Sequence, residues 1–136
     1  MTAALKMKHA VDPREEIYQK VGMKKLGVVP GFKLHGNRVL VAPYERPELT
    51  AGGIKLPDSY RKEDEHQGKA ALVLMKGHSA FKSDDNFDFG DDDVEPGEWV
   101  ALWVTDGRKI VINGKTCRII RDQDILMKID APDSIY

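Results

Sequence analysis

The side chains that could do chemistry in this sequence are few and scattered. Its single cysteine, Cys117, lies inside an apolar run, where the pKa of a thiol rises instead of falling. One cysteine also excludes an intramolecular disulfide and a cysteine-based zinc cluster. The four histidines are dispersed, and none stands four residues from another type of metal ligand; they are His9, His35, His66 and His78.

Other catalytic patterns are equally weak. No serine has the context of a nucleophile elbow, and Ala51-Gly52-Gly53 lacks the Lys and Ser/Thr of a phosphate-binding loop. We therefore expect no enzyme activity, no cofactor and no bound metal.

An acidic stretch at residues 84–95, DDNFDFGDDDVE, resembles a calcium loop in its spacing of oxygen ligands. However, Phe89 stands where an EF-hand loop needs glycine, Asp91 stands at its usual apolar position, and Pro96-Gly97 prevents a following helix. A solvated acidic loop or hairpin explains the stretch better. Its aromatic side chains would then pack locally; they are Phe81, Phe87 and Phe89.

The strongest functional candidate is the long connection at residues 46–67, RPELTAGGIKLPDSYRKEDEHQ. Connections beyond ~12–15 residues are usually functional or disordered. Gly52-Gly53 gives backbone freedom, and Pro57 favours an extended Leu56. Ile54 and Leu56 would then share one face, with Lys55 turned toward water. A core strand is the alternative, but three residues between Gly-Gly and Pro make a poor one.

The energetics of such a loop favour several copies acting together. Burying Ile54 and Leu56 in a partner could gain ~1.5–3 kcal/mol each. Ordering each loop residue costs ~1–2 kcal/mol of backbone entropy. A single loop should therefore bind weakly, whereas several loops on one ring could gain ~10²–10⁴ in avidity. The loop predicts an oligomer as well as a partner.

The signals for a helix precede this loop. Asp12-Pro13-Arg14-Glu15 has an N-cap, a proline at the first helical position and a capping-box glutamate, and Gly22 is a plausible end. Ile17 and Val21 would form a small apolar stripe. A helix this short is marginal alone, because isolated helices need ~12–15 residues. It must dock on its own domain or on a partner.

Short apolar runs separated by turn residues predict an all-β domain, a small barrel or sandwich, after this helix. Asn113-Gly114 between two runs indicates a hairpin. The contiguous Val39-Leu40-Val41 suggests burial on both faces or at a subunit interface. The expected strands are 37–43, 69–75, 98–104, 109–112, 115–120 and 125–129. We divide the chain into an N-terminal extension at 1–35, a β domain at 36–130 and a tail at 131–136.

Composition limits the setting of this domain. The chain has 136 residues and a formal net charge of -1, which suits one domain and argues against a nucleic-acid partner. No apolar run approaches the ~20 residues that span a membrane. No secretory signal pattern opens the chain. We expect a soluble, cytoplasmic protein that contacts neither nucleic acid nor membrane.

Taken in order, these residues resemble the GroES-type co-chaperonins over positions 34 to 130. The resemblance lies in Asn37-Arg38-Val39, the loop Ala51-Gly52-Gly53-Ile54-Lys55-Leu56-Pro57, Gln67-Gly68-Lys69, Val94-Glu95-Pro96-Gly97 and Asp124-Ile125-Leu126. It implies a small irregular GroES-like β-barrel with a mobile loop and a roof hairpin over the acidic stretch, assembled as a heptamer. The N-terminal extension and the longer acidic stretch mark a divergent member, and a viral origin is one explanation for the divergence.

The resemblance also implies a partner and roles for residues. The loop Gly52-Gly53-Ile54-Lys55-Leu56-Pro57 would bind a GroEL-type chaperonin ring, with Ile54 and Leu56 in a groove of each subunit, and the cap would enclose unfolded client protein. First and last strands of neighbouring subunits would meet at Val39, Leu40, Val41, Ile125, Met127 and Ile129. The alternative is a virion or assembly protein that reuses the barrel and attaches through its N-terminal extension.

Overall fold

The residues that the structure describes form one short helix and six antiparallel strands. The structure, a computed structural model, describes residues 12–45, 55, 59, 69–83, 85, 87–103 and 106–132. The elements in chain order are α1 (Pro13–Val21), β1 (Arg38–Pro43), β2 (Ala70–Lys76), β3 (Trp99–Leu102), β4 (Arg108–Ile112), β5 (Lys115–Arg121), the 3-10 turn η1 (Asp122–Asp124) and β6 (Ile125–Ile129). The predicted all-β fold with one short helix is confirmed.

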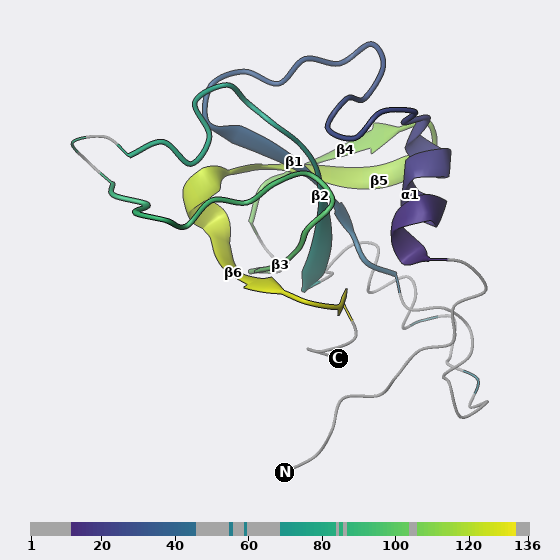
Figure 1. Ribbon diagram of the computed structural model, residues 1–136. Helices are drawn as coiled ribbons and strands as arrows, with labels where there is room; N and C mark the ends of the chain where they lie inside the picture. The colour runs from purple at the N-terminus through teal and green to yellow at the C-terminus, as the bar shows by residue number, and fades with distance from the viewer. Residues whose placement is uncertain are drawn as a thin grey trace.

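The strands form one sheet in the order β4-β5-β1-β2-β3-β6 (Figure 1). β1 lies in the middle and pairs with β5 on one edge and β2 on the other, with Leu40 opposite both Ile119 and Met75. β4 and β6 are the two outer strands. Val39, Leu40 and Val41 are therefore paired on both sides within one chain.

Both faces of the central strands are buried, because alternate side chains enter two separate clusters. On β1, Leu40 and Ala42 belong to a cluster that α1 covers with Ile17 and Val21. Val39 and Val41 belong to the cluster on the opposite face. Burial on both faces thus explains the contiguous apolar run, and the alternation follows from the two-residue period of a strand.

The chain between β2 and β3 covers the second cluster. Ala80 and Val94 are buried in it, and Phe81 and Ile125 pack against it. The acidic stretch was expected to be a loop or, by resemblance, a roof hairpin. Its described residues form turns and contain no strand. Phe89 makes ring contacts with Phe81 and Phe87, so the predicted local packing of these aromatic side chains is confirmed.

Helix α1 begins and ends as its sequence predicts. The Asp12 side chain accepts a hydrogen bond from the Arg14 backbone N–H at 2.9 Å, and Pro13 is the first helical residue. Gly22 adopts a left-handed conformation, and the Met23 N–H donates to the Tyr18 carbonyl at 2.9 Å. Because Ile17 and Val21 are buried in the first cluster, the helix docks on its own domain. No helix of the described residues is long and apolar enough to cross a membrane.

Candidate partner-binding loop and its root

The long loop leaves the sheet and returns to it at neighbouring positions. β1 and β2 are antiparallel partners, with Pro43 opposite Ala71 at the end from which the chain departs. Beyond that pair, the Tyr44 N–H donates to the Ala70 carbonyl at 2.8 Å. On the returning side, the Lys69 carbonyl accepts a bond from the Leu102 N–H at 2.9 Å. Both ends of the loop are thus fixed to one end of the sheet.

An ion pair holds the departing end. The Lys115 ammonium lies 2.9 Å from the Glu45 carboxylate and 3.4 Å from the Pro43 carbonyl. The Lys115 side chain is only 5% exposed, whereas that of Glu45 is 22% exposed. Burial of a cation is tolerated when such partners satisfy it. The pair therefore fixes Glu45 at the point where the loop begins.

Tyr44 anchors the same end from the core side. Its ring meets Trp99 edge to face at 5.6 Å between centroids, and both rings are buried. Such aromatic pairs add about 0.5–1.5 kcal/mol beyond the area they bury. The loop thus starts from a rigid base instead of from a free strand end.

The β4–β5 turn connects this root to helix α1. Asn113 and Gly114 both have positive φ, 50° and 81°, as the predicted tight hairpin requires. The Asn113 side-chain amide donates to the carbonyl of Val21 at 2.9 Å. Lys115 follows this turn directly, so the helix end, the turn and the loop root lie in one connected set of contacts.

Most of the residues predicted to bind a partner lie outside the described part of the chain. They are Gly52, Gly53, Ile54, Leu56 and Pro57. Lys55 is described and is exposed, as expected for a side chain turned toward water. The contact of this loop with a chaperonin stays a prediction.

The predicted interface residues fall into two groups. Val39, Leu40 and Val41 are buried within their own chain and are paired on both sides. A subunit interface through these three residues stays a prediction. Their burial within their own chain does not favour it. On the outer strand β6, Met127 and its neighbour Leu126 are exposed, while Ile125 and Ile129 are partly buried. Only the β6 residues present an apolar surface to solvent.

Sequence reasoning missed Lys115 and Glu45. Both look like ordinary surface charges in the sequence, because nothing in their spacing shows that residue 115 reaches residue 45. The one available signal is that Lys115 opens a buried strand, in which a lysine needs an acidic partner. For Cys117 the sequence prediction is confirmed, because burial raises the pKa of its thiol to about 11.

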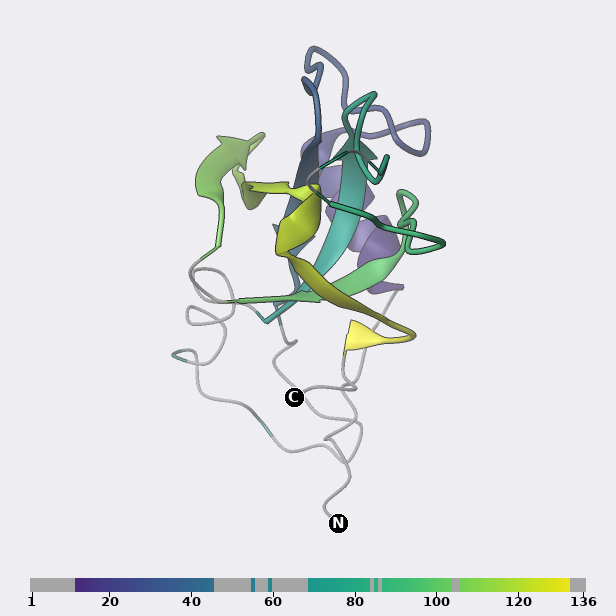
Figure 2. The same cartoon turned by 90° about the vertical axis from the view of Figure 1, so that its left-hand side faces the viewer.

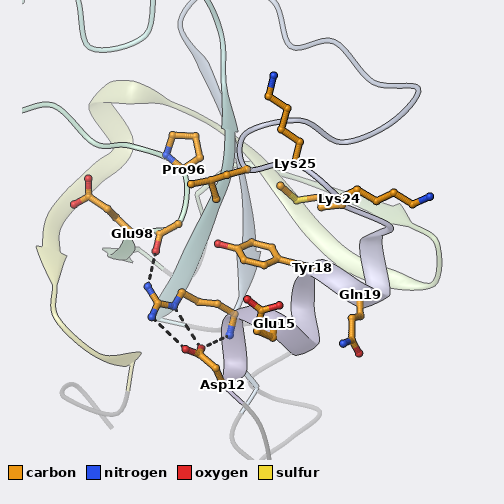
Figure 3. Close-up of a pocket in the computed structure, with 12 residues that line it drawn as sticks. Asp12, Glu15, Tyr18, Gln19, Lys24, Lys25, Pro96 and Glu98 are labelled. Atoms are coloured by element: carbon orange, nitrogen blue, oxygen red, sulfur yellow. Dashed lines mark hydrogen bonds and ion pairs between the residues drawn. The ribbon is translucent and has the colours of Figure 1, made fainter.

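Another concavity lies away from the loop root. A cavity of about 550 Å³ separates α1 from Pro96 and Glu98 (Figure 3). Arg14 spans it, bonding the Asp12 carboxylate at 3.2 Å and the Gly97 carbonyl at 3.5 Å. The charges at this joint therefore neutralise one another, and we assign it no ligand. Among the described residues, no group of three or more His, Cys, Asp or Glu side chains could hold a metal ion.

A small all-β domain with a long Gly-Gly-Ile-Lys-Leu-Pro loop at one end of its sheet is the architecture expected from the resemblance to co-chaperonins. The family model for the chaperonin 10 kDa subunit matches residues 32–129, and the chain belongs to this family. The predicted resemblance is thereby confirmed.

Curated relatives agree with that family. The chain is 38% identical to co-chaperonin GroES 1 of Rhodopirellula baltica over 93 residues, which is 68% of this chain and 86% of the relative. It is 36% identical to co-chaperonin GroES of Dinoroseobacter shibae, over 66% of this chain and 82% of the relative. With co-chaperonin GroES of Methylacidiphilum infernorum the identity is 31%, over 76% of this chain and 98% of the relative. All three relatives are named as co-chaperonins.

Proposed function

We propose that the protein caps a chaperonin ring and assists ATP-dependent folding of enclosed client proteins. Ile54 and Leu56 would enter a groove on each chaperonin subunit, and the chaperonin would hydrolyse the ATP. The carrying observation is the loop root: a connection with two apolar residues between Gly-Gly and Pro is fixed at both ends to a rigid sheet. The names of the relatives, which are co-chaperonins, support the same function.

The proposed cap is a homo-oligomer, and a heptamer is the expected form. A single pair of apolar side chains gains too little to order a long loop. Several loops on one ring would add their contributions through effective concentration. The outer strand β6, with exposed Leu126 and Met127, offers an apolar edge for assembly.

A pull-down on a chaperonin ring tests this function. With nucleotide present, the wild-type chain should bind the chaperonin, and Ile54→Asp should abolish binding because a carboxylate cannot enter an apolar groove without a large desolvation cost. Ser59→Ala is the control, since Ser59 is exposed in the same long connection and lies outside the six residues predicted to bind. Unchanged capture of Ile54→Asp would contradict the proposal, as would a wild-type chain that is monomeric by native mass spectrometry.

The rival function, attachment through the N-terminal extension, needs a different test in view of the fold. Deleting residues 1 to 35 would remove Ile17 and Val21 from the core and damage the barrel itself. Charge reversals at the exposed Glu16 and Lys20 leave the core intact. If these reversals abolish partner binding while Ile54→Asp does not, attachment through the extension is the correct function.

A further inference from the structure

A hollow lined by aromatic and aliphatic side chains lies between β6 and the chain that joins β2 to β3. We call it the aromatic groove. Its volume is about 330 Å³, and its apolar lining includes Phe81, Phe87, Phe89, Val94, Ile125 and Met127. Asp92 and Asp93 stand at its rim, and both are exposed, as is Asp91 beside them. The groove is therefore mainly apolar inside and carries Asp91 and Asp92 at its edge, while Asp93 pairs with Lys76 at 3.1 Å and Lys128 also lines the groove.

Hydrogen bonds fix the walls of the aromatic groove in place. The buried Asp122 carboxylate accepts a bond from the Phe81 N–H at 3.1 Å. The Ser83 hydroxyl accepts from the Phe89 N–H at 3.0 Å and donates to Asp88 at 2.9 Å. Ring contacts join Phe89 to Phe81 and to Phe87 at 5.7 and 4.5 Å between centroids. A preformed groove binds at lower entropic cost than one that must first be ordered.

One wall of the aromatic groove is also an open edge of the sheet. β6 pairs with β3 and is the last strand in the sheet order. Leu126 and Met127 expose about half of their surfaces, 52% each. An outer strand with exposed apolar side chains is a ready surface for pairing with another chain.

The complementary surface lies just after helix α1. We call Lys24, Lys25, Leu26 and Val28 the basic patch; all four are exposed. From Ile17 to Tyr44 the chain has five cationic residues and no acidic one; they are Lys20, Lys24, Lys25, Lys33 and Arg38. Lys24, Lys25 and Leu26 also line the cavity beside α1, and in Figure 3 the ends of the two lysine side chains extend away from it. This patch combines apolar side chains with positive charge. Its charge is opposite to that of the aspartates at the groove rim.

The local backbone holds the basic patch in a defined shape. Lys25 and Val28 form an isolated antiparallel bridge, with the Val28 N–H donating to the Lys25 carbonyl at 3.2 Å. Gly27 between them has φ +80°, and a Cβ there would meet Pro96 at 3.3 Å. The patch also precedes residues 32–129, which the family model matches. The patch therefore lies outside the part of the chain that the family model matches.

The two surfaces lie on opposite sides of the molecule. In Figure 1, α1 is at the right and β6 at the left, and Figure 2, seen from the left, has β6 in front of the sheet and α1 behind it. The patch lies beside α1, with Leu26 and Gly27 close to Gly97 and Pro96, and no patch residue lines the groove. Contact between them needs a second copy, and a head-to-tail contact of this kind generates a ring when the rotation closes.

We propose that the basic patch of one copy docks on the aromatic groove of the next, with Leu26 or Val28 on the apolar lining and Lys24 and Lys25 against Asp91 and Asp92. This contact rests on the assembly contained in the proposed function and adds a second seam that the extension supplies. It gives the acidic stretch a partner of opposite charge. Attraction between such charges sets the register of an interface and speeds assembly.

A charge-reversal exchange tests the contact on the full-length chain. Lys24→Glu with Lys25→Glu should weaken subunit association about tenfold or more, and Asp91→Lys with Asp92→Lys should do the same, because each places like charges together. Combining all four changes in one chain should restore association. The matched control is Arg108→Glu with Lys109→Glu on the exposed strand β4, which should leave association unchanged. Sedimentation and native mass spectrometry measure the association, and circular dichroism checks that each variant is folded.

Salt gives an independent readout. Raising the salt concentration from about 0.05 M to about 1 M shortens the screening length severalfold. At high salt, subunit association of the wild type and of the fourfold exchange should weaken, because attraction between opposite charges is screened. Association of the two double reversals should strengthen, because repulsion between like charges is screened.

The outcomes separate this contact from the proposed function. Wild-type rings that bind chaperonin, together with reversals that have no effect, would overturn the contact and leave the function standing. Reversals that weaken assembly without rescue by the fourfold exchange would also overturn it. A wild-type chain that stays monomeric under all conditions would overturn both.

Discussion

At the scale of single residues, the ion pair between Lys115 and Glu45 holds the start of the loop. Lys115 is more buried than Glu45, so replacing one or the other should lower the stability of the protein by different amounts. Glu45→Ala removes the carboxylate from the buried Lys115 ammonium, which keeps its 3.4 Å contact with the Pro43 carbonyl, and should lower the free energy of unfolding by about 3 kcal/mol. Lys115→Met keeps an apolar side chain of similar length, while Glu45 can turn toward water. It should cost about 1 kcal/mol or less. Chemical denaturation measures both.

The control for this comparison is Glu16→Ala, which removes an exposed ion pair on α1 and should change stability by less than about 0.5 kcal/mol. If Lys115→Met lowers the free energy of unfolding as much as Glu45→Ala does, the unequal burial of the two groups does not determine the stability cost of breaking the ion pair.

At the scale of elements, helix α1 behaves as part of the core and not as an appendage. Val21 is fully buried beneath the β4–β5 turn, and its carbonyl receives the Asn113 amide. Val21→Ala should destabilise the whole domain by about 2–3 kcal/mol, because it removes buried methyl groups and leaves a cavity. Lys20→Ala in the same helix should stay within about 0.5 kcal/mol. Thermal or urea unfolding that shows an unaltered β domain in Val21→Ala would contradict this integration.

The local signals explain why the elements themselves were predictable. Asp12 and Gly22 bound the helix because a capping side chain and a left-handed glycine act within a few residues. Asn113-Gly114 specified its turn for the same reason. The strand pattern was also sufficient for β6, whose predicted range of 125–129 agrees with the structure.

Long-range pairing was not predictable in the same way. An apolar run such as Val39-Leu40-Val41 predicts that these residues are buried, but it does not identify the elements that cover them. The strand pairing in the structure is needed to show that β1 lies between β5 and β2. The reach from Lys115 to Glu45 likewise depends on how β5 and β1 are placed beside each other. The family resemblance, and not the residue pattern, indicated the loop's partner.

At the scale of the whole molecule, the proposed cap would gain its affinity from assembly, because a single loop is expected to bind weakly. Met127→Lys places a charge on the exposed outer strand and should break the ring without unfolding the subunit, because the side chain is 52% exposed. The loop sequence is unchanged, yet chaperonin binding should fall by about 10²–10⁴, the factor expected when several tethered contacts become one. Val111→Lys, on the outer strand β4 at the other end of the sheet, is the matched control and should retain both ring and binding. Native mass spectrometry reports the assembly and a chaperonin titration reports the affinity. A monomeric Met127→Lys that still binds like wild type would show that one loop is sufficient, and the energetic case for a ring would then fail.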